Sequence, residues 1–173
     1  METLFFKKTQ EIKREKASLE KRLNVTIAIK GNLVSIEGSS IDEYEALRIF
    51  EAMQTGFSAK KALWLLDEGI IFRKINIKKF TRRKDTKEVR SRIIGKDGKT
   101  KRTIEEISNC YINIEDSNLL GIICPAESIE EVTTALTNLI KGSKQANVYH
   151  FLEKINAVKK SQISDLGLKI KIE

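Results

Sequence analysis

The sequence lacks the features that mark membrane and secreted proteins. No apolar run approaches the ~20 residues that a membrane-spanning helix needs. The first ten residues, METLFFKKTQ, contain neither the long apolar stretch nor the small-residue cleavage site of a secretory leader. We therefore expect a cytoplasmic protein that does not bind membranes.

Cysteine and histidine are scarce, which argues against a metal site. Cys110 and Cys124 have no Cys-x-x-Cys spacing and no nearby histidine, so we expect free thiols in strands, with a cross-strand disulfide as the minor alternative. The sole histidine, His150, lies on an apolar helical segment, where packing is favoured over catalysis or metal binding. We predict no enzymatic activity, no metal and no cofactor.

Basic residues are abundant, and they are concentrated in one part of the chain. The net charge is +8, while residues 78–102 alone contain twelve lysines and arginines against three acidic residues. That segment therefore has a local charge of +9, and the rest of the protein sums to about −1. A charge run is usually a solvated face, but an excess of this density favours a polyanionic partner.

The first half of the chain has the hydrophobic periodicities of a small α+β unit. A charged helix from Lys7 to Leu23 has a sparse apolar stripe at Ile12, Leu19 and Leu23. Two alternating segments joined by Gly31 and Asn32 predict a β-hairpin. In order, the predicted elements are a strand (1–6), a helix (7–23), the hairpin (25–30 and 33–37), a helix (41–54) and a short helix (58–68).

The second half repeats this order. Phe50, Met53 and Gly56 correspond to Leu136, Leu139 and Gly142 at a constant offset of 86 residues. We therefore predict an α+β fold of two tandem units, 1–69 and 70–156, each a three-stranded antiparallel sheet with helices on one face, followed by a tail, 157–173. The second unit should contain a strand (70–80), helices (86–94 and 99–109), a hairpin (111–115 and 119–124) and helices (129–141 and 145–156).

Between the first two helices of the second unit lies a Gly-x-x-Gly loop, Gly95 to Gly98, preceded by an apolar pair and followed by a basic helix. Glycines allow close approach of a ligand to the backbone, and amides at a helix start favour anions. The loop therefore suits the phosphates of a nucleic acid strand. The predicted binding residues are Arg90, Arg92, Ile94, Gly95, Lys96, Asp97, Gly98, Lys99, Arg102 and Ile112.

We predict different roles for these residues. Lys96, Lys99 and Arg102 should add positive charge beside the loop, whereas Arg90 and Arg92 should steer the strand or stack on it. The acidic residues Glu105 and Glu106 are interpreted as salt-bridge partners on the helix rather than as metal ligands.

The order strand, helix, Gly-x-x-Gly, helix, strand, strand, helix resembles a type I KH domain, through the segment IIGKDGKTKRTIEEISNCYINI. The resemblance implies that the loop clamps about four nucleotides of a single strand by their backbone, with the bases in a groove beside it. It also implies apolar side chains in or under that groove. We assign Ile94 and Ile112 to the groove and Ile104 to the core.

A closer resemblance rests on RIIGKDGKTKRTIEEIS, YINI, LLGII and NVYHFLEK. These segments are similar to archaeal tandem KH-domain ribosome-assembly factors, relatives of the eukaryotic partner of the nuclease that trims small-subunit rRNA. That family implies single-stranded RNA binding near the 3′ end of 16S rRNA during its maturation. It also implies two protein partners, a PIN-domain endonuclease and the α subunit of initiation factor two.

The first copy departs from this family because Gln10, Glu11, Ile12 and Lys13 occupy the place of the glycine loop. Side chains there would hold a strand away from the backbone amides, so we expect the first unit to pack or to bind protein. Two alternatives for the whole chain remain open. One is a KH protein that binds mRNA or single-stranded DNA, and the other is a protein-interaction scaffold whose basic surface meets an acidic partner.

Overall fold

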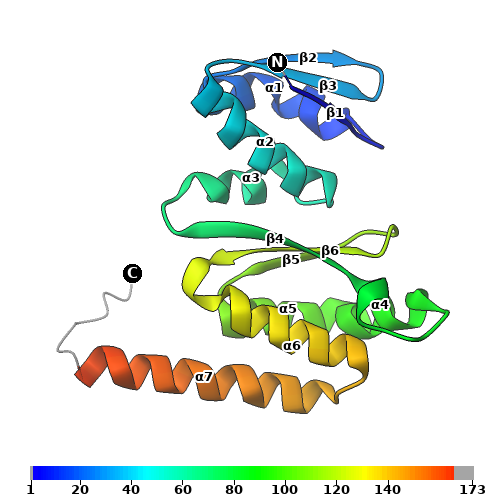
Figure 1. Cartoon of the computed structure of the whole chain (residues 1–173), viewed down its shortest axis with the longest axis vertical. Helices are drawn as coiled ribbons and strands as arrows, with labels where there is room; N and C mark the ends of the chain where they lie inside the picture. The colour runs from blue at the N-terminus through cyan, green and yellow to red at the C-terminus, as the bar shows by residue number, and fades with distance from the viewer. Residues whose placement is uncertain (1, 166–173) are drawn as a thin grey trace. The chain divides into compact units, whose positions relative to one another are not determined.

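The computed structural model describes residues 2–165 and has an α+β fold with two three-stranded sheets (Figure 1). The chain divides into two compact units, residues 2–75 with 113–123, and residues 76–112 with 124–165. The boundary that we predicted near residue 70 falls between the two sheets. The hairpin residues 113–123 nevertheless group with the first unit.

The sheet of the first unit has the order β1-β3-β2, and both pairings are antiparallel. Its strands are β1 (Glu2–Phe5), β2 (Thr26–Lys30) and β3 (Leu33–Glu37). Alternation along β2 and β3 places Ile27, Val34 and Ile36 on the buried face. The hairpin predicted from this pattern is confirmed, and Gly31 provides the positive φ of its turn.

Three helices complete the first unit, namely α1 (Gln10–Leu23), α2 (Ser40–Gln54) and the short α3 (Ala59–Ala62), which runs into the 3-10 turn η1 (Leu63–Leu66). The buried residues of α1 are Ile12, Leu19 and Leu23, as its sparse apolar stripe predicted. The Ser39 hydroxyl accepts the N–H of Asp42 and caps α2. Gln10 to Lys13 form the first turn of α1, so the first unit has no loop there.

The second sheet has the order β4-β6-β5, which repeats the order of the first sheet. The predicted strand from Ile70 is shorter than expected, because the chain turns into a 3-10 helix, η2, at Ile77. The elements are β4 (Ile70–Asn76), η2 (Ile77–Lys79), α4 (Thr86–Ile94), η3 (Lys96–Gly98), α5 (Lys99–Ser108), β5 (Tyr111–Ile114), β6 (Leu119–Pro125), η4 (Ala126–Ser128), α6 (Ile129–Lys141) and α7 (Gln145–Asp165).

Helix α7 is longer than the sequence predicted. It continues to Asp165, whereas we expected it to end at Asn156; the alternating segment LKIKI lies outside the described residues. The extra turns make specific contacts, since Lys159 Nζ donates to the carbonyl of Glu127 at 2.8 Å and pairs with Glu131 at 3.1 Å. Asn156 also donates to the carbonyl of Ile107 on α5. The trailing helix is therefore an integral part of the second unit.

The junction between helix and hairpin is built in the same way in both units. In the first unit, Glu20 Oε1 accepts the N–H of Ile27 at 2.8 Å. In the second, Glu105 Oε1 accepts the N–H of Ile112 at 2.7 Å. These carboxylates satisfy a strand donor that would otherwise lack a partner. Each helix ends at an asparagine with left-handed backbone, Asn24 (φ 52°) and Asn109 (φ 48°).

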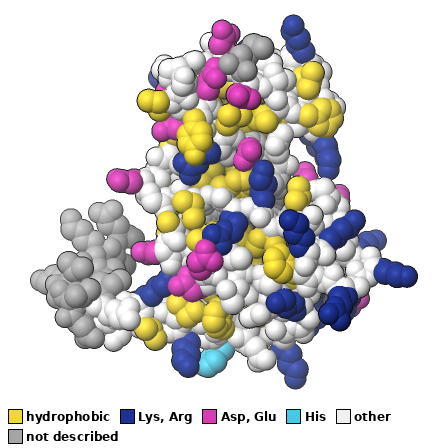
Figure 2. Space-filling model, viewed as in Figure 1, with side chains coloured by type: hydrophobic (Ala, Val, Ile, Leu, Met, Phe, Trp, Pro, Cys, Tyr) yellow, Lys and Arg dark blue, Asp and Glu magenta, His cyan; other side chains and the backbone are white. Residues whose placement is uncertain are grey.

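The predictions for the two cysteines and for the sole histidine have different outcomes. Cys110 and Cys124 are buried thiols that form no disulfide, as predicted, but only Cys124 lies in a strand, because Cys110 immediately precedes β5. Burial raises the pKa of the Cys110 thiol to about 12, so this thiol stays protonated near neutral pH. The predicted packing of His150 is wrong, because this side chain is exposed on α7 (Figure 2).

Among residues 2–165, no cluster of His, Cys, Asp and Glu could hold a metal ion, and no helix is long and apolar enough to cross a bilayer.

Candidate nucleic-acid interface

Helix α4 leads into the glycine loop. Asp85 caps it by accepting the N–H of Lys87 at 2.8 Å, and Val89 and Ile93, four residues apart, form its buried face. The helix ends where Gly95, with φ 76°, donates its N–H to the carbonyl of Ser91 at 2.8 Å. A glycine in this conformation lets the chain leave the helix sharply.

The loop itself is a tight bend exposed to solvent. Three of its four residues have positive φ, namely Gly95 (76°), Asp97 (52°) and Gly98 (75°). The N–H of Gly98 donates to the carbonyl of Gly95 at 3.3 Å, which closes the bend. The side chains of Lys96 and Asp97 are exposed. The tip of the bend is therefore open to solvent, while Gly95 and Gly98 are half-buried and the Arg102 side chain lies against the Asp97 carbonyl.

The two glycines are required for different reasons. A Cβ at Gly95 would lie 2.1 Å from Thr100 Oγ1 and 2.7 Å from the Thr100 backbone nitrogen. A Cβ at Gly98 would meet nothing closer than 3.9 Å. Gly95 is thus fixed by packing against Thr100, which is buried, and Gly98 by its backbone conformation alone. Thr100 was not among the predicted site residues, and only its place one residue into the helix after the loop could have indicated it.

Helix α5 begins directly after the loop and has no side-chain cap. Its N-cap residue is Gly98, and no side-chain hydrogen bond is made at this end of the helix. The N–H of Lys99 donates to the carbonyl of Lys96, but the next amides of the first turn have no intrahelical partner, and the positive end of the helix dipole lies beside them. Together with the open bend, this end of α5 can accept an anionic oxygen.

The predicted cations around the loop have distinct roles. Lys96 and Lys99 are exposed, and neither forms an ion pair with any residue in the described part of the chain. Arg102 is also exposed, but its Nη2 donates to the carbonyl of Asp97 at 2.7 Å. Lys96 and Lys99 are available to meet phosphates, while Arg102 holds the bend and adds charge beside it.

The guanidinium of Arg92, which we predicted to steer a strand or stack on it, is bound by carbonyl groups of its own unit. Its Nη2 donates to the carbonyls of Gly142 at 2.9 Å and Ser143 at 3.2 Å, just beyond the C-terminus of α6. Its own carbonyl accepts from Gln145 Nε2 at 3.2 Å. Arg92 thus fastens the end of α4, one turn before the loop, to the junction of α6 and α7. Arg90 is half-buried and makes contacts of its own.

We predict that Arg92→Met destabilises the protein by about 2 kcal/mol, since charge-assisted hydrogen bonds to two terminal carbonyls are lost. Urea denaturation measures this, with the exposed Arg82→Met as the matched control, which should change the free energy of unfolding by less than about 0.5 kcal/mol. Arg92→Lys should recover part of the loss. Equal stabilities for the Arg92 and Arg82 variants would contradict the fastening role.

Of the isoleucines assigned to the groove or the core, one is exposed at the surface and two are buried in the core. Ile94 is 39% exposed at the end of α4, so it is available to a base. Ile112 is fully buried, so its assignment to the groove is wrong. Its N–H is held by Glu105, and this register turns its side chain into the core. Ile104 is also fully buried, as predicted.

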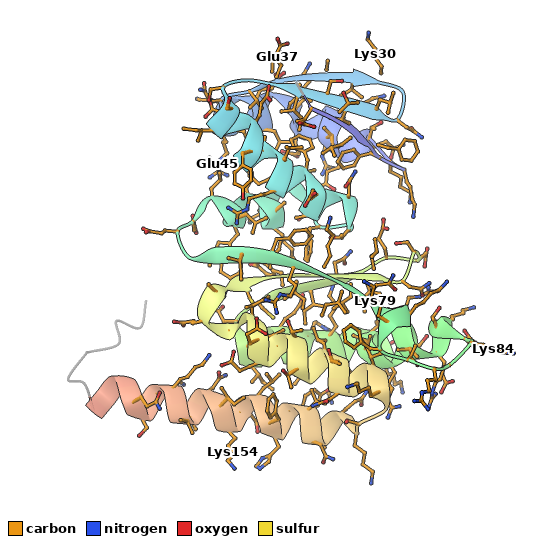
Figure 3. All side chains as sticks on the ribbon, viewed as in Figure 1. Lys30, Glu37, Glu45, Lys79, Lys84 and Lys154 are labelled. Carbon is orange, nitrogen blue, oxygen red and sulfur yellow. The ribbon has the colours of Figure 1, made fainter. Side chains whose placement is uncertain are left out.

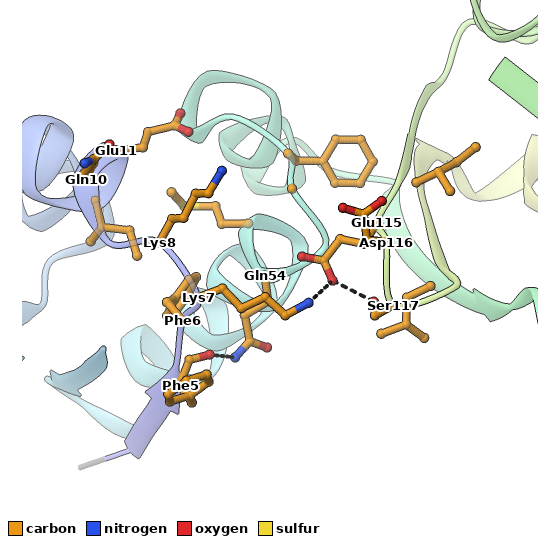
Figure 4. Close-up of a pocket in the computed structure, with 16 residues that line it drawn as sticks. Phe5, Phe6, Lys7, Lys8, Gln10, Glu11, Gln54, Glu115, Asp116 and Ser117 are labelled. Atoms are coloured by element: carbon orange, nitrogen blue, oxygen red, sulfur yellow. Dashed lines mark hydrogen bonds and ion pairs between the residues drawn. The ribbon is translucent and has the colours of Figure 1, made fainter. Parts of the chain in front are cut away.

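A cavity of about 760 Å³ lies in the first unit, away from the glycine loop in sequence (Figure 4). Phe5, Phe6 and Gln54 line one side, and Gln54 Nε2 donates to the carbonyl of Phe5 at 2.8 Å. Lys7 and Glu115 form an ion pair of 3.6 Å beside it. The lining mixes cations, acids and apolar side chains, so it lacks the single sign of charge that a polyanion site needs.

Comparisons with known proteins support the assignment of the second unit. A family model described as the eukaryotic type KH domain, KH-domain type I, matches residues 71–157, half of the chain. A KH domain-containing protein of Methanocaldococcus jannaschii is 27% identical over 80% of this chain. The chain spans only 64% of the length of that relative.

Solved structures of similar proteins have the same fold as this chain. Dim2p from Pyrococcus horikoshii matches with a TM-score of 0.78 and 29% identity, covering 88% of this chain and 98% of that one. A chain of the a/eIF2alpha–aDim2p–rRNA complex from the same organism matches with a TM-score of 0.80 and 28% identity, covering 91% and 94%. A protein of unknown function from Aeropyrum pernix, 24% identical, shares the fold with a TM-score of 0.79 over 95% and 96% of the two chains.

The order of elements, the open Gly-x-x-Gly bend between α4 and α5 and the matched family model agree with one another. The chain belongs to the type I KH-domain family of RNA-binding proteins.

Proposed function

We propose that the protein binds single-stranded RNA at Gly95 to Gly98 and acts in assembly of the small ribosomal subunit, near the 3′ end of 16S rRNA during its maturation. The observation that carries the proposal is the exposed glycine bend at the uncapped start of α5. In this mechanism phosphates lie against the bend and the first amides of α5, and Lys96 and Lys99 neutralise their charge.

The first unit supports a binding role for the bend. It has the same sheet order and the same helix–hairpin junction as the second unit, yet Gln10 to Lys13 are the first turn of α1 and form no bend. The shared part of the fold therefore forms without a glycine bend. Glycine adopts positive φ without strain, but the left-handed backbone of Asp97 in this bend costs free energy, which a ligand site would justify.

Choice of sequence must come from the bases, because contacts to phosphates carry no sequence information. Ile94 is the exposed apolar side chain nearest in sequence to the bend and is proposed to contact a base. We expect modest discrimination between sequences from this one unit, since the bend clamps only about four nucleotides.

The ribosomal part of the proposal is supported by the solved relatives. One matched structure contains a/eIF2alpha, aDim2p and rRNA, and this chain covers 94% of the chain that it matches there. By that likeness we propose small-subunit rRNA as the ligand and the α subunit of initiation factor two as a protein partner. A PIN-domain endonuclease is proposed as a further partner. The protein is proposed to carry out this function in the cytoplasm.

We further propose that the chain is a tandem of two KH-like units, 1–69 and 70–156. The equal sheet orders and the two equivalent pairs, Glu20 with Ile27 and Glu105 with Ile112, support this. Because side chains of α1 replace the glycine bend, the first unit is proposed to bind protein rather than RNA.

Competition binding tests the ligand. We expect an oligonucleotide from the 3′ end of 16S rRNA to displace a labelled copy of itself better than a scrambled RNA or the matching DNA does. Equal displacement by DNA would favour the alternative of a general single-strand binder. A protein complex that survives nuclease treatment, with no binding to any of the three oligonucleotides, would favour the interaction scaffold.

A further inference from the structure

A second basic feature precedes the glycine bend and takes no part in the site described above. Residues 78–87, KKFTRRKDTK, join η2 to α4 and contain six cations and one acid. Every lysine and arginine among them is exposed. Figure 3 labels Lys79 and Lys84 on the segment that leads into α4. Hereafter these ten residues are called the basic strip.

Few of these charges are neutralised within the protein. The only acid of the strip, Asp85, is engaged in capping α4. Arg83 pairs with Glu88 at 2.5 Å. In the described part of the chain, the remaining cations of the strip have no acidic partner; these are Lys78, Lys79, Arg82, Lys84 and Lys87. Cations close together without counter-charges repel one another and create a positive electrostatic potential. Binding of an anionic ligand would reduce this repulsion.

An aromatic ring lies among these cations. Phe80 is 38% exposed and follows Lys79 directly. A single exposed phenylalanine is ordinary on a protein surface. Beside unpaired lysines and arginines, however, it matches the combination found where proteins bind single strands, with cations along the backbone and a ring on which a base stacks. An acidic protein segment would use the cations and leave the ring without a role.

The strip and the bend lie at opposite ends of α4. A helix of nine residues is about 13 Å long, which is about four stacked nucleotides at ~3.4 Å each. A strand held at Gly95 to Gly98 could therefore reach the strip only if it extends several nucleotides beyond the four that the bend clamps.

We propose that the basic strip is a second contact for the same single-stranded RNA, with Arg82, Lys84 and Lys87 binding phosphates and Phe80 stacking on a base. The inference rests on the proposed RNA binding at the glycine bend and extends it. The protein would then bind a longer single strand of RNA, with the glycine bend holding one part of the strand and the basic strip binding the flanking nucleotides.

Length-dependent binding tests this inference on the full chain. The probes are fluorescein-labelled oligouridylates of five and twelve nucleotides, titrated at several salt concentrations. The triple variant Arg82→Gln/Lys84→Gln/Lys87→Gln should bind the five-nucleotide probe as the parent does. For the twelve-nucleotide probe, its slope of log K against log salt should be smaller in magnitude by about 2, since each phosphate contact contributes ~0.7.

Phe80→Ala gives an independent signature. It should weaken binding of the twelve-nucleotide probe about fivefold or more without changing the salt slope, because stacking involves no release of counterions. The matched charge control is Lys30→Gln/Lys154→Gln/Lys160→Gln, which removes three exposed charges from β2 and α7. This control should leave the slopes for both probes close to those of the parent.

The outcomes separate failure of the strip from failure of the bend. An unchanged slope for the triple variant on the long probe, or equal losses on both probes, would overturn the strip as a distinct contact. Lys96→Asp, measured beside it, should remove binding of both probes if the bend is the primary site. If Lys96→Asp binds both probes normally, the proposed function fails, whatever the triple variant does.

Discussion

Lys96→Asp is expected to lower the affinity for single-stranded RNA about 100-fold while leaving the melting temperature unchanged. The substitution removes one charge-assisted contact and places an anion against phosphates, and the lost contact alone is worth about 1.5–3 kcal/mol. Stability should not change, because Lys96 is exposed and has no ion-pair partner among residues 2–165. Fluorescence anisotropy and thermal melting measure the two quantities on the same sample.

Milder and distant substitutions are the controls for this result. Lys96→Ala should weaken binding less and reduce the magnitude of the salt slope by about 0.7, the contribution of one phosphate on a single strand. Lys154→Asp makes the same charge change on an exposed position of α7 and should alter affinity only slightly. Affinity retained by Lys96→Asp would reject the glycine bend as the RNA site.

Local patterns were sufficient to predict most of the fold. The ends of α4 and α6 were predicted to the residue, and the structure shows Asp85 capping the start of the first helix and Gly142 following the end of the second. Alternation located the strands of both hairpins, and the stripe Ile12, Leu19 and Leu23 identified the buried face of α1. Each of these signals lies within a few residues of the element that it specifies.

Contacts between distant residues were not predictable in the same way. Arg92 was assigned to RNA from its position in a basic run, but the carbonyls that it binds are 50 and 51 residues away. Ile112 was assigned to the groove by the resemblance to KH domains, and its strand pattern does not state which face is buried. His150 was assigned to the interior from apolar neighbours, although Val148 and Leu152 are the residues of that turn that α7 buries.

The second large expected effect is a loss of folding stability on substitution of a glycine of the bend. Gly95 and Gly98 have equivalent places in the Gly-x-x-Gly pattern, but their surroundings in the structure differ. Gly95→Ala is expected to destabilise the protein by about 4 kcal/mol, combining a backbone conformation that only glycine tolerates with an overpacked contact. The backbone angles at Gly95 are φ 76° and ψ 175°, and the new methyl would lie 2.1 Å from Thr100 Oγ1. Such a loss is a large share of the 5–15 kcal/mol that stabilises a typical domain.

Gly98→Ala is the matched control because it adds the same methyl to the same bend. Its backbone is left-handed, with φ 75° and ψ 11°, and the nearest atom would be Arg102 Nε at 3.9 Å. The expected cost is therefore only about 1–2 kcal/mol, from backbone conformation alone. Urea denaturation of the two variants measures the difference, and equal losses would contradict the assignment of Gly95 to packing.

The same pair separates folding from binding. Thr100→Ala should rescue Gly95→Ala only in part, because the Thr100 Cβ and backbone nitrogen, both 2.7 Å from the added methyl, remain in place. Gly98→Ala should keep the fold but weaken RNA binding, since its methyl stands at the first amides of α5 where a phosphate would approach. If Gly98→Ala folds and binds RNA as the parent does, those amides do not contact the strand. In that case Lys96 and Lys99 hold it by charge alone.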